Sequence, residues 1–296
     1  MLTGKPLEWL GIFLAACSLW ALGGCGGASS EAEGENRFDA GAAWHLVERQ
    51  VAVGQRPAGS PQLRRLAAEL RPLLPHGRFE SIPGYPALRN LVGTLPGREP
   101  AIVIGAHYDT LARPRGFVGA NNGAAGTAVV IEAARALRRL PAGADPREVR
   151  FVLFDGEEPA RELPEETADF YHEGLRGSRA YVAAHPGGTA AMILLDYVGN
   201  RGLRLPREAT SDPRLWSRVL AAAEAVGASK FFSASSGGGI IDDHTPFLRL
   251  GVPAVDLIDW SYPGHSLADR LDRLSRRSLD GVGETVVQLA EELRAE

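Results

Sequence analysis

Short apolar runs alternate along this chain with longer segments of helical periodicity. The apolar runs have the length of strands, and several are apolar almost throughout, as expected of central strands buried on both faces. The alternation predicts an α/β fold in which helices cover a largely parallel sheet. The expected strands are residues 90–95, 101–106, 149–155, 191–197, 230–233 and 254–259. The expected helices are residues 40–53, 61–74, 124–140, 174–184, 213–226, 243–250 and 278–294.

Chain length and charge limit the number of domains and the kind of partner. With 296 residues, of which 45% are hydrophobic, the chain can form one large core, or two small ones if a linker divides it. We find no such linker and no internal repeat, so we expect one folded domain over residues 37–296. The formal net charge is -4, with 32 basic and 36 acidic residues spread along the chain. No basic face is indicated, which argues against nucleic acid and favours a small or peptide substrate.

Residues 1–25 have the pattern of a secretion signal. Lys5 is followed by the apolar run Trp9–Leu22, which is shorter than a typical membrane-spanning helix. The run ends in "LGGC", which resembles the bacterial lipobox, so Cys25 is the expected site of lipidation. This pattern favours an exported bacterial lipoprotein, held by a lipid anchor at the periplasmic or extracellular face of a membrane. A second match, "LAAC" at 14–17, and an ordinary cleaved signal are the alternatives.

Residues 26–36 are small, polar and acidic, which is typical of a flexible tether. The two cysteines, Cys17 and Cys25, both lie ahead of this segment. The mature domain therefore has no disulfide and no cysteine with which to bind a metal. Any metal site must use histidine and carboxylate ligands.

Polar residues that could carry chemistry follow the expected strands. His107 and Asp109 come after one apolar run, Glu157 and Glu158 after another, and Asp196 ends a third. The carboxyl ends of strands line the ligand crevice in an open α/β sheet, so these residues can converge there. His265 lies in a Pro/Gly turn before the last helix and is a further candidate.

Each candidate also has an ordinary structural explanation. Adjacent carboxylates at Glu157 and Glu158 are costly beside apolar surroundings unless a cation or a shared proton offsets them, but they also fit a solvated acidic turn. Asp196 fits a turn cap, and His265 an exposed loop. Asp242 and the residue after it open a short helix, where a capping role is expected for one of the two.

Seven segments in this order resemble the glutaminyl-peptide cyclotransferase and M28 zinc aminopeptidase superfamily. The resemblance runs from about Val51 to the C-terminus, and "FDGEE", "LLDYVG" and "DDHTPFL" are closer to the cyclases. It implies a single-domain, three-layer sandwich of the zinc exopeptidase type, with a mostly parallel, mixed central sheet flanked by helices. The segments are "AHYDT", "GANNGAAG", "FDGEE", "GLRGSRAYV", "LLDYVG", "DDHTPFLRLGVPAV" and "YPGHSLADRLDRLS".

The resemblance also implies roles for individual residues. One Zn²⁺ in the cyclases is held at the positions of Asn122, Glu158 and His265. Glu157 matches the general acid/base, while Asp196 and Asp242 match residues that hydrogen-bond the reacting groups. In the aminopeptidases a second zinc is bound at the positions of His107 and Asp196, and we expect Asp109 to be either a ligand or part of the scaffold there.

Two positions depart from the family pattern. Asn122 replaces an aspartate ligand and so removes one negative charge from the zinc site, which argues against a bridging role between two metals. Because Asn122 precedes Gly123, we hypothesise that deamidation restores an aspartate in part of the molecules. Gly264 stands where the cyclases carry a bulky aromatic residue, and we expect Trp260 and Tyr262 to form that wall of the substrate pocket.

The implied activity is conversion of the N-terminal glutamine of a peptide into pyroglutamate with release of ammonia. A metallo-aminopeptidase, with two zinc ions, is the first alternative. A catalytically weak peptide-binding homologue is the second, because of Asn122. All three would bind a peptide or small molecule with a free N-terminus.

Overall fold

The computed structural model describes residues 1, 36–161, 163 and 167–296. The expected signal segment, Cys25 and almost all of the expected tether lie outside the described residues, so export and lipidation stay predictions. The described residues from Asn36 onwards form one compact unit. Within the part of the chain that is described, no helix has both the length and the apolarity needed to cross a membrane.

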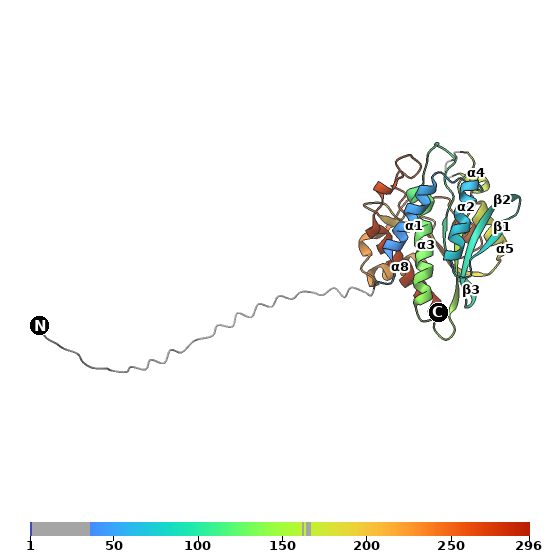
Figure 1. Cartoon of the computed structure of the whole chain (residues 1–296). Helices are drawn as coiled ribbons and strands as arrows, with labels where there is room; N and C mark the ends of the chain where they lie inside the picture. The colour runs from blue at the N-terminus through green and yellow to red at the C-terminus, as the bar shows by residue number, and fades with distance from the viewer. Residues whose placement is uncertain (2–35, 162, 164–166) are drawn as a thin grey trace. The chain divides into compact units, whose positions relative to one another are not determined.

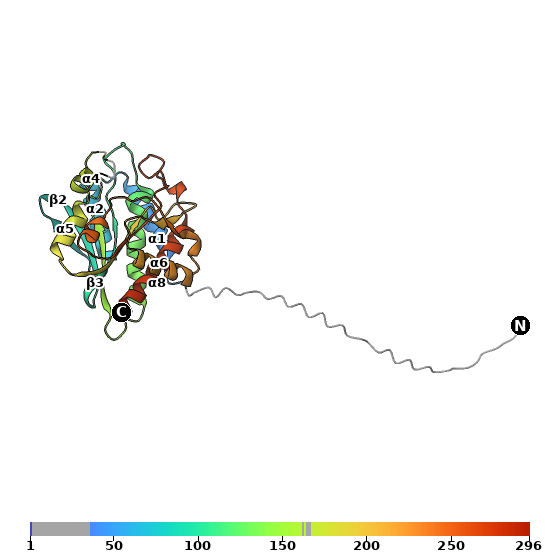
Figure 2. The same ribbon diagram turned by 180° about the vertical axis from the view of Figure 1, so that it is seen from behind.

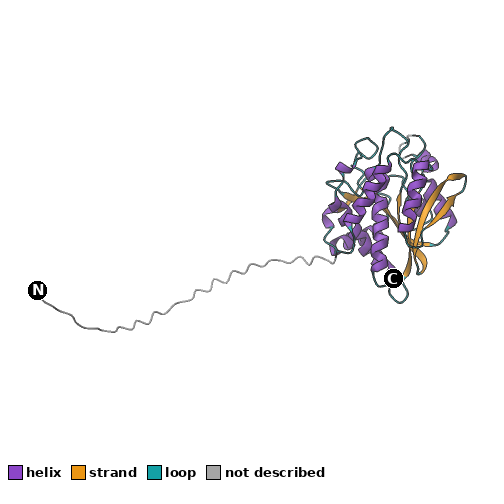
Figure 3. Cartoon of the chain, in the orientation of Figure 1, coloured by secondary structure: helices purple, strands orange, loops and turns teal. Residues whose placement is uncertain are grey.

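A six-stranded sheet in the order β1-β2-β4-β3-β5-β8 forms the centre of this unit (Figure 3). The pairs β1–β2 and β2–β4 are antiparallel, while β4–β3, β3–β5 and β5–β8 are parallel. The predicted mostly parallel, mixed sheet is confirmed. Its strands are β1 (Arg78–Ile82), β2 (Tyr85–Leu95), β3 (Arg98–His107), β4 (Arg147–Phe154), β5 (Thr189–Asp196) and β8 (Ala254–Ile258).

Helices cover both faces of the sheet. Side chains alternate across each strand, so Ile102 and Ile104 join the core on one face while Val103 joins the core on the other. The first face packs against α1 (Ala40–Val53), α2 (Pro61–Leu70), α3 (Gly126–Arg139), α6 (Pro213–Ala225) and α8 (Arg276–Ala295). The second packs against α5 (Arg176–Ala184) and α7 (Thr245–Arg249). Figure 1 shows α1 and α3 in front of the sheet, and Figure 2 gives the opposite view.

The strand and helix predictions were wrong in a few segments. Residues 230–233 do not enter the central sheet, because Ser229–Phe231 forms a 3-10 turn and β7 (Phe232–Ser236) pairs with β6 (Leu205–Arg207) in a separate two-stranded sheet. The edge strand β1 was missed since its sequence, RFESI, has no apolar run. The short elements β6 and α4 (Ala168–Glu173) were also missed. Helix α2 ends earlier than expected, at Leu70, just before Pro72.

Gly126 allows the start of α3 to pack directly against β5. A Cβ atom at this position would lie 2.2 Å from the backbone oxygen of Leu195 and 3.0 Å from the Cβ atom of Ala106. The absence of a side chain therefore lets the start of α3 approach the carboxyl ends of the central strands. That approach places the segment before α3, which carries Asn122, beside the candidate site.

We predict that Gly126→Ala destabilises the protein. Alanine in place of glycine normally favours a helix by about 1 kcal/mol, but here the added methyl group clashes with backbone, and overpacking of this kind costs about 1–3 kcal/mol. The free energy of unfolding from urea titration measures the net effect. Gly143→Ala is the control, because a Cβ atom there would meet nothing within 4 Å. An unchanged stability of Gly126→Ala would contradict this packing argument.

Candidate active site

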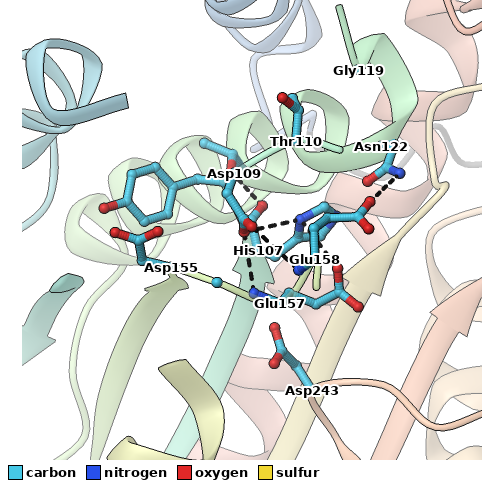
Figure 4. Close-up of polar contacts among 12 residues, drawn as sticks. His107, Asp109, Thr110, Gly119, Asn122, Asp155, Glu157, Glu158 and Asp243 are labelled. Carbon is cyan, nitrogen blue, oxygen red and sulfur yellow. Dashed lines mark hydrogen bonds and ion pairs between the residues drawn. The ribbon is translucent and has the colours of Figure 1, made fainter. Parts of the chain in front are cut away.

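The candidate residues meet where three parallel strands end. In the register of β3 and β4, His107 pairs with Phe154, and the Glu157–Glu158 turn follows directly. Asp196 is the last residue of the neighbouring strand β5. Figure 4 shows the side chains of His107, Glu157 and Glu158 gathered at this edge. The predicted convergence at the carboxyl ends of the strands is what the structure shows.

Asp109 holds the double-glutamate turn in place. Its two carboxylate oxygens accept hydrogen bonds from the backbone amides of Glu157, at 3.3 Å, and Glu158, at 3.2 Å. On the other side of the turn, the amide of Leu175 donates to the backbone oxygen of Glu157 at 3.1 Å, and Arg176 donates to that of Glu158. The alternative explanation of a solvated acidic turn is therefore wrong for Glu157 and Glu158, whose exposed fractions are 6% and 3%. Asp109 has a scaffolding position.

Burial and mutual repulsion make Glu157 a weak acid. Burial, followed by the negative charge of Glu158, raises the pKa of Glu157 well above its usual value, although His107 opposes the shift. A carboxyl group with a raised pKa exchanges protons near neutral pH more readily than an exposed one. The Glu157 side chain is thus suited to general acid/base chemistry.

His107 lies among three carboxylates. Its Nδ1 atom is 3.5 Å from Asp109 Oδ1 and 3.8 Å from Glu157 Oε2, and its Nε2 atom is 3.5 Å from Asp196 Oδ1. Burial alone would lower the pKa of His107, but the facing carboxylates of Asp109, Asp196 and Glu157 raise it well above its usual value. A protonated His107 consequently offsets part of the negative charge that the site buries.

Asn122, Glu158 and His265 form the other half of the site. Asn122 Nδ2 donates to Glu158 Oε1 at 2.7 Å, and His265 Nε2 lies 3.6 Å from the same oxygen. The backbone amide of Asn122 is fixed by Asp269, whose Oδ2 accepts it at 3.0 Å. The three residues that the family resemblance assigns to zinc are therefore neighbours.

Two orphaned atoms indicate where a metal ion fits. Asn122 Oδ1 and Glu158 Oε2 are buried and lack a hydrogen-bond partner among the described residues. Buried polar atoms of this kind normally have a partner. Together with the His265 imidazole they offer two oxygens and one nitrogen, a donor set that zinc accepts. Within the described residues, no group of three or more His, Cys, Asp or Glu is arranged to hold a metal, and the amide at position 122 is one reason.

Aromatic side chains form a pocket next to His265, which we call the aromatic pocket. Trp260 stacks on Tyr197 with ring centroids 5.9 Å apart and planes 7° from parallel, and Tyr262 packs on the same ring at 5.8 Å. Gly264 is required here because a Cβ atom would lie 2.3 Å from the Tyr197 ring. The pocket has a volume of about 290 Å³ and is lined by Tyr197, Trp260, Tyr262, Pro263, Gly264, His265 and Ser266.

Further carboxylates surround the far side of Glu157. Asp196 Oδ1 accepts the backbone amide of Tyr197 at 2.8 Å, and Asp242 Oδ1 accepts that of Asp243 at 2.5 Å. Neither Asp242 nor Asp243 caps α7, so the expected capping role is wrong. Burial and then the charge of Asp196 raise the pKa of Asp242 to about 6. Figure 4 shows Asp243 on the Glu157 side of the site, and Ser178 donates to its carboxylate.

Several residues of the site were missed from the sequence. His244 is fully buried, with Nε2 at 2.9 Å from Thr210 Oγ1 and 3.3 Å from Glu208 Oε2, and with Nδ1 at 3.8 Å from Asp256 Oδ2. Burial and the charge of Asp242 raise the pKa of Asp256 well above its usual value. One signal was available, because Asp256 interrupts the apolar strand AVDLI. Tyr197 and Asp269 gave no comparable signal.

We predict that Asp109→Asn weakens both fold and site. An amide side chain can accept only one of the two backbone N–H groups well, which leaves a buried donor without a partner at a cost of about 1–3 kcal/mol. Urea unfolding measures this loss. Asp39→Asn is the matched control, because Asp39 caps α1 and asparagine caps a helix equally well. Equal stabilities of the two variants would argue against a scaffolding role for Asp109.

We predict opposite effects of Asn122→Asp without and with zinc. In EDTA the new carboxylate faces Glu158 in place of an N–H donor, so we expect a loss of about 1–3 kcal/mol. With zinc the added anionic ligand should raise affinity, so the zinc-induced rise in melting temperature should exceed that of the wild type. Thermal unfolding over a zinc series measures both effects, and peptide mapping establishes that residue 122 is asparagine in the wild-type sample.

The matched control is Asn121→Asp. The Asn121 amide is also buried, but it contacts Gly199 and Asn200 rather than Glu158. This variant should lose stability in EDTA and gain no zinc response. If Asn122→Asp behaves in the same way, position 122 is not a metal ligand.

Comparisons with known proteins identify the family of this chain. Residues 90–290 match the model of peptidase family M28. Glutaminyl-peptide cyclotransferase from Bos taurus is 30% identical over 233 residues, which cover 67% of this chain and 64% of that protein. The chain thus spans less than two thirds of the length of this curated relative.

Solved structures similar to this chain come from both branches of the family. Glutaminyl cyclase from Porphyromonas gingivalis superimposes with a TM-score of 0.74 at 28% identity, covering 87% of this chain and 99% of that one. A leucine aminopeptidase precursor from Bacteroides thetaiotaomicron gives a TM-score of 0.74 at 25% identity, covering 86% and 97%. Since the family model matches more than half of its length, the chain belongs to peptidase family M28, as a glutaminyl-cyclase-like member.

Proposed function

We propose that this protein is a glutaminyl-peptide cyclotransferase that converts the N-terminal glutamine of peptides into pyroglutamate and releases ammonia. The observation that carries the proposal is the buried Glu157, whose raised pKa and position beside Glu158 and His107 suit proton transfer. The similarity to cyclases from cattle and from Porphyromonas gingivalis supports the same reaction. In this reaction the substrate's own α-amine attacks its γ-carboxamide, so water is not the nucleophile.

The residues divide into those that hold the substrate and the one that moves a proton. Glu157 takes a proton from the attacking α-amine and delivers it to the departing ammonia. Asp196 and Asp242 accept hydrogen bonds from the amine and the amide nitrogen. The stacked rings of Tyr197 and Trp260 exclude water from the glutamine side chain, which lowers the chance of hydrolysis.

Asn122, Glu158 and His265 would hold a single zinc ion. Such an ion, when bound, polarises the γ-carbonyl group of the substrate as a Lewis acid. Asn122 supplies a neutral oxygen where the family has a carboxylate, so we expect weak binding of zinc and binding of one ion rather than two.

An aminopeptidase is the second candidate, and His107 is the observation that favours it. Its Nε2 atom lies 3.5 Å from Asp196 Oδ1, and these two residues match the second-metal ligands of the peptidases. The structural similarity to a leucine aminopeptidase precursor is in keeping with this candidate. The neutral amide of Asn122 argues against it, because one amide oxygen is a poor bridge between two divalent metal ions.

We predict that the zinc-loaded protein releases ammonia from peptides with an N-terminal glutamine, and that Glu157→Gln lowers kcat by about 10²–10⁴-fold, as expected for loss of a general acid/base. Coupled ammonia assays measure this. Wild-type activity should fall as the pH drops through the raised pKa of Glu157, and this decline should be absent from the residual activity of the variant. Glu224→Gln, an exposed change on α6, is the control.

The alternatives give different products. If the protein releases a free amino acid from aminoacyl substrates and no ammonia from glutaminyl peptides, it is an aminopeptidase and the cyclase proposal is wrong. Absence of both activities in the zinc-loaded wild type, together with activity of Asn122→Asp, would show a peptide-binding homologue.

A further inference from the structure

A second and larger pocket adjoins the aromatic pocket, and we call it the basic pocket. It has a volume of about 540 Å³, within the range of about 300–1,000 Å³ typical of ligand sites. Trp260 lines both pockets, so both lie against this one side chain. Its walls include Arg204, Pro206, Lys230, Phe232, Asp259 and Trp260.

The basic pocket presents two exposed cations, and Lys230 is close enough to Asp280 for its charge to oppose the rise in pKa that burial gives that carboxyl group. Arg204 and Lys230 are both exposed, and neither forms an ion pair within the described part of the chain. Lys230 Nζ instead lies 4.8 Å from the centre of the Phe231 ring. In a protein whose net charge is -4, two exposed cations in one pocket favour a negatively charged ligand.

Asp259 is the acidic residue of the basic pocket, and its carboxylate accepts several hydrogen bonds from the protein. Its Oδ2 atom accepts from Asn200 Nδ2 at 2.8 Å and from the backbone amide of Arg204 at 3.0 Å. Its Oδ1 atom accepts from the backbone amide of Ser261 at 3.2 Å. The side chain is 3% exposed and its hydrogen-bond donors are neutral, so its charge remains, and the two cations with this one carboxylate give the lining of the basic pocket a net charge of +1.

The position of Trp260 connects this pocket to the reaction. A peptide whose first residue lies against Tyr197 and His265 leaves the aromatic pocket along Trp260, which is 39% exposed. Each following residue advances the extended chain by about 3.3–3.6 Å. Residues after the first one can therefore reach the basic pocket.

A third pocket, on another side of His265, is a less suitable path for an acidic peptide. It has a volume of about 370 Å³, and it is lined by one cation, Arg113, together with the carboxylate of Glu158. A negatively charged segment would meet repulsion there. The basic pocket has two cations and apolar walls, which suit the charged end and the methylene groups of an acidic side chain.

We propose that the basic pocket is a subsite for the substrate residues that follow the N-terminal one, and that it selects peptides with Asp or Glu at these positions. The proposal rests on the proposed function of the same site. Arg204 and Lys230 bind the substrate carboxylates, and Trp260 packs against the peptide between the two pockets.

The test compares binding of two amidated peptides, Gln-Ala-Glu-Glu-Ala and Gln-Ala-Gln-Gln-Ala, which differ only in their carboxylates. Isothermal titration calorimetry with the Glu157→Gln protein measures binding without turnover. Because each exposed ion pair contributes only a few-fold, we expect the acidic peptide to bind about 5–10-fold more tightly. This preference should shrink at high salt and fall below about twofold in Arg204→Ala/Lys230→Ala.

Arg65→Ala/Arg138→Ala is the matched control. It removes two exposed cations, on α2 and α3, that line neither pocket, so the preference should be kept. Equal binding of the two peptides would overturn the proposal. A preference that survives in Arg204→Ala/Lys230→Ala, or that is lost in Arg113→Ala instead, would overturn it as well.

Failure of the subsite and failure of the proposed function give different results. If the two peptides bind equally and have equal kcat/KM values for ammonia release, the cyclase proposal stands and the subsite proposal fails. If the binding preference depends on Arg204 and Lys230 but neither peptide releases ammonia, the subsite proposal stands and the cyclase proposal fails.

Discussion

The burial of adjacent carboxylates is the constraint on which the rest of the site depends. Glu157 and Glu158 are both almost inaccessible, and each buried negative charge is costly unless hydrogen bonds, a cation or a proton offsets it. Asp109 fixes their backbone but adds a further negative charge. The structure meets this cost in part with protons, since burial and the charge of Asp109 also raise the pKa of Asp155 to about 7.

The His107 imidazole and the Asn122 amide offset further negative charge in the site. The carboxylates around His107 raise its pKa, so a proton on its imidazole offsets part of their charge. Asn122 donates a hydrogen bond to Glu158, which takes the role that a metal ion would otherwise have for that oxygen. Both features offset part of the negative charge that the site buries.

The aromatic pocket, which contains His265, and the neighbouring basic pocket have walls of different chemistry. Tyr197 fills the space over Gly264 and stacks with Trp260, so an aromatic wall arises from residues that are distant in sequence. The same Trp260 borders Arg204 and Lys230, which gives the outer part of the site a positive charge. The aromatic pocket and the basic pocket thus offer different chemistry to the first residue of a peptide and to those after it.

The sequence by itself determined the α/β class, the central strands and the convergence of His107, Glu157 and Asp196, because apolar runs and the residues that follow them are local signals. It did not locate β1 and β6, which lack apolar runs, or the separate pairing of β7. The tertiary structure alone decided the scaffolding position of Asp109, the orphaned oxygens of Asn122 and Glu158, and the packing of Tyr197 against Gly264. These features depend on contacts between residues far apart in the chain, and on burial that shifts pKa values, neither of which is written in any local pattern.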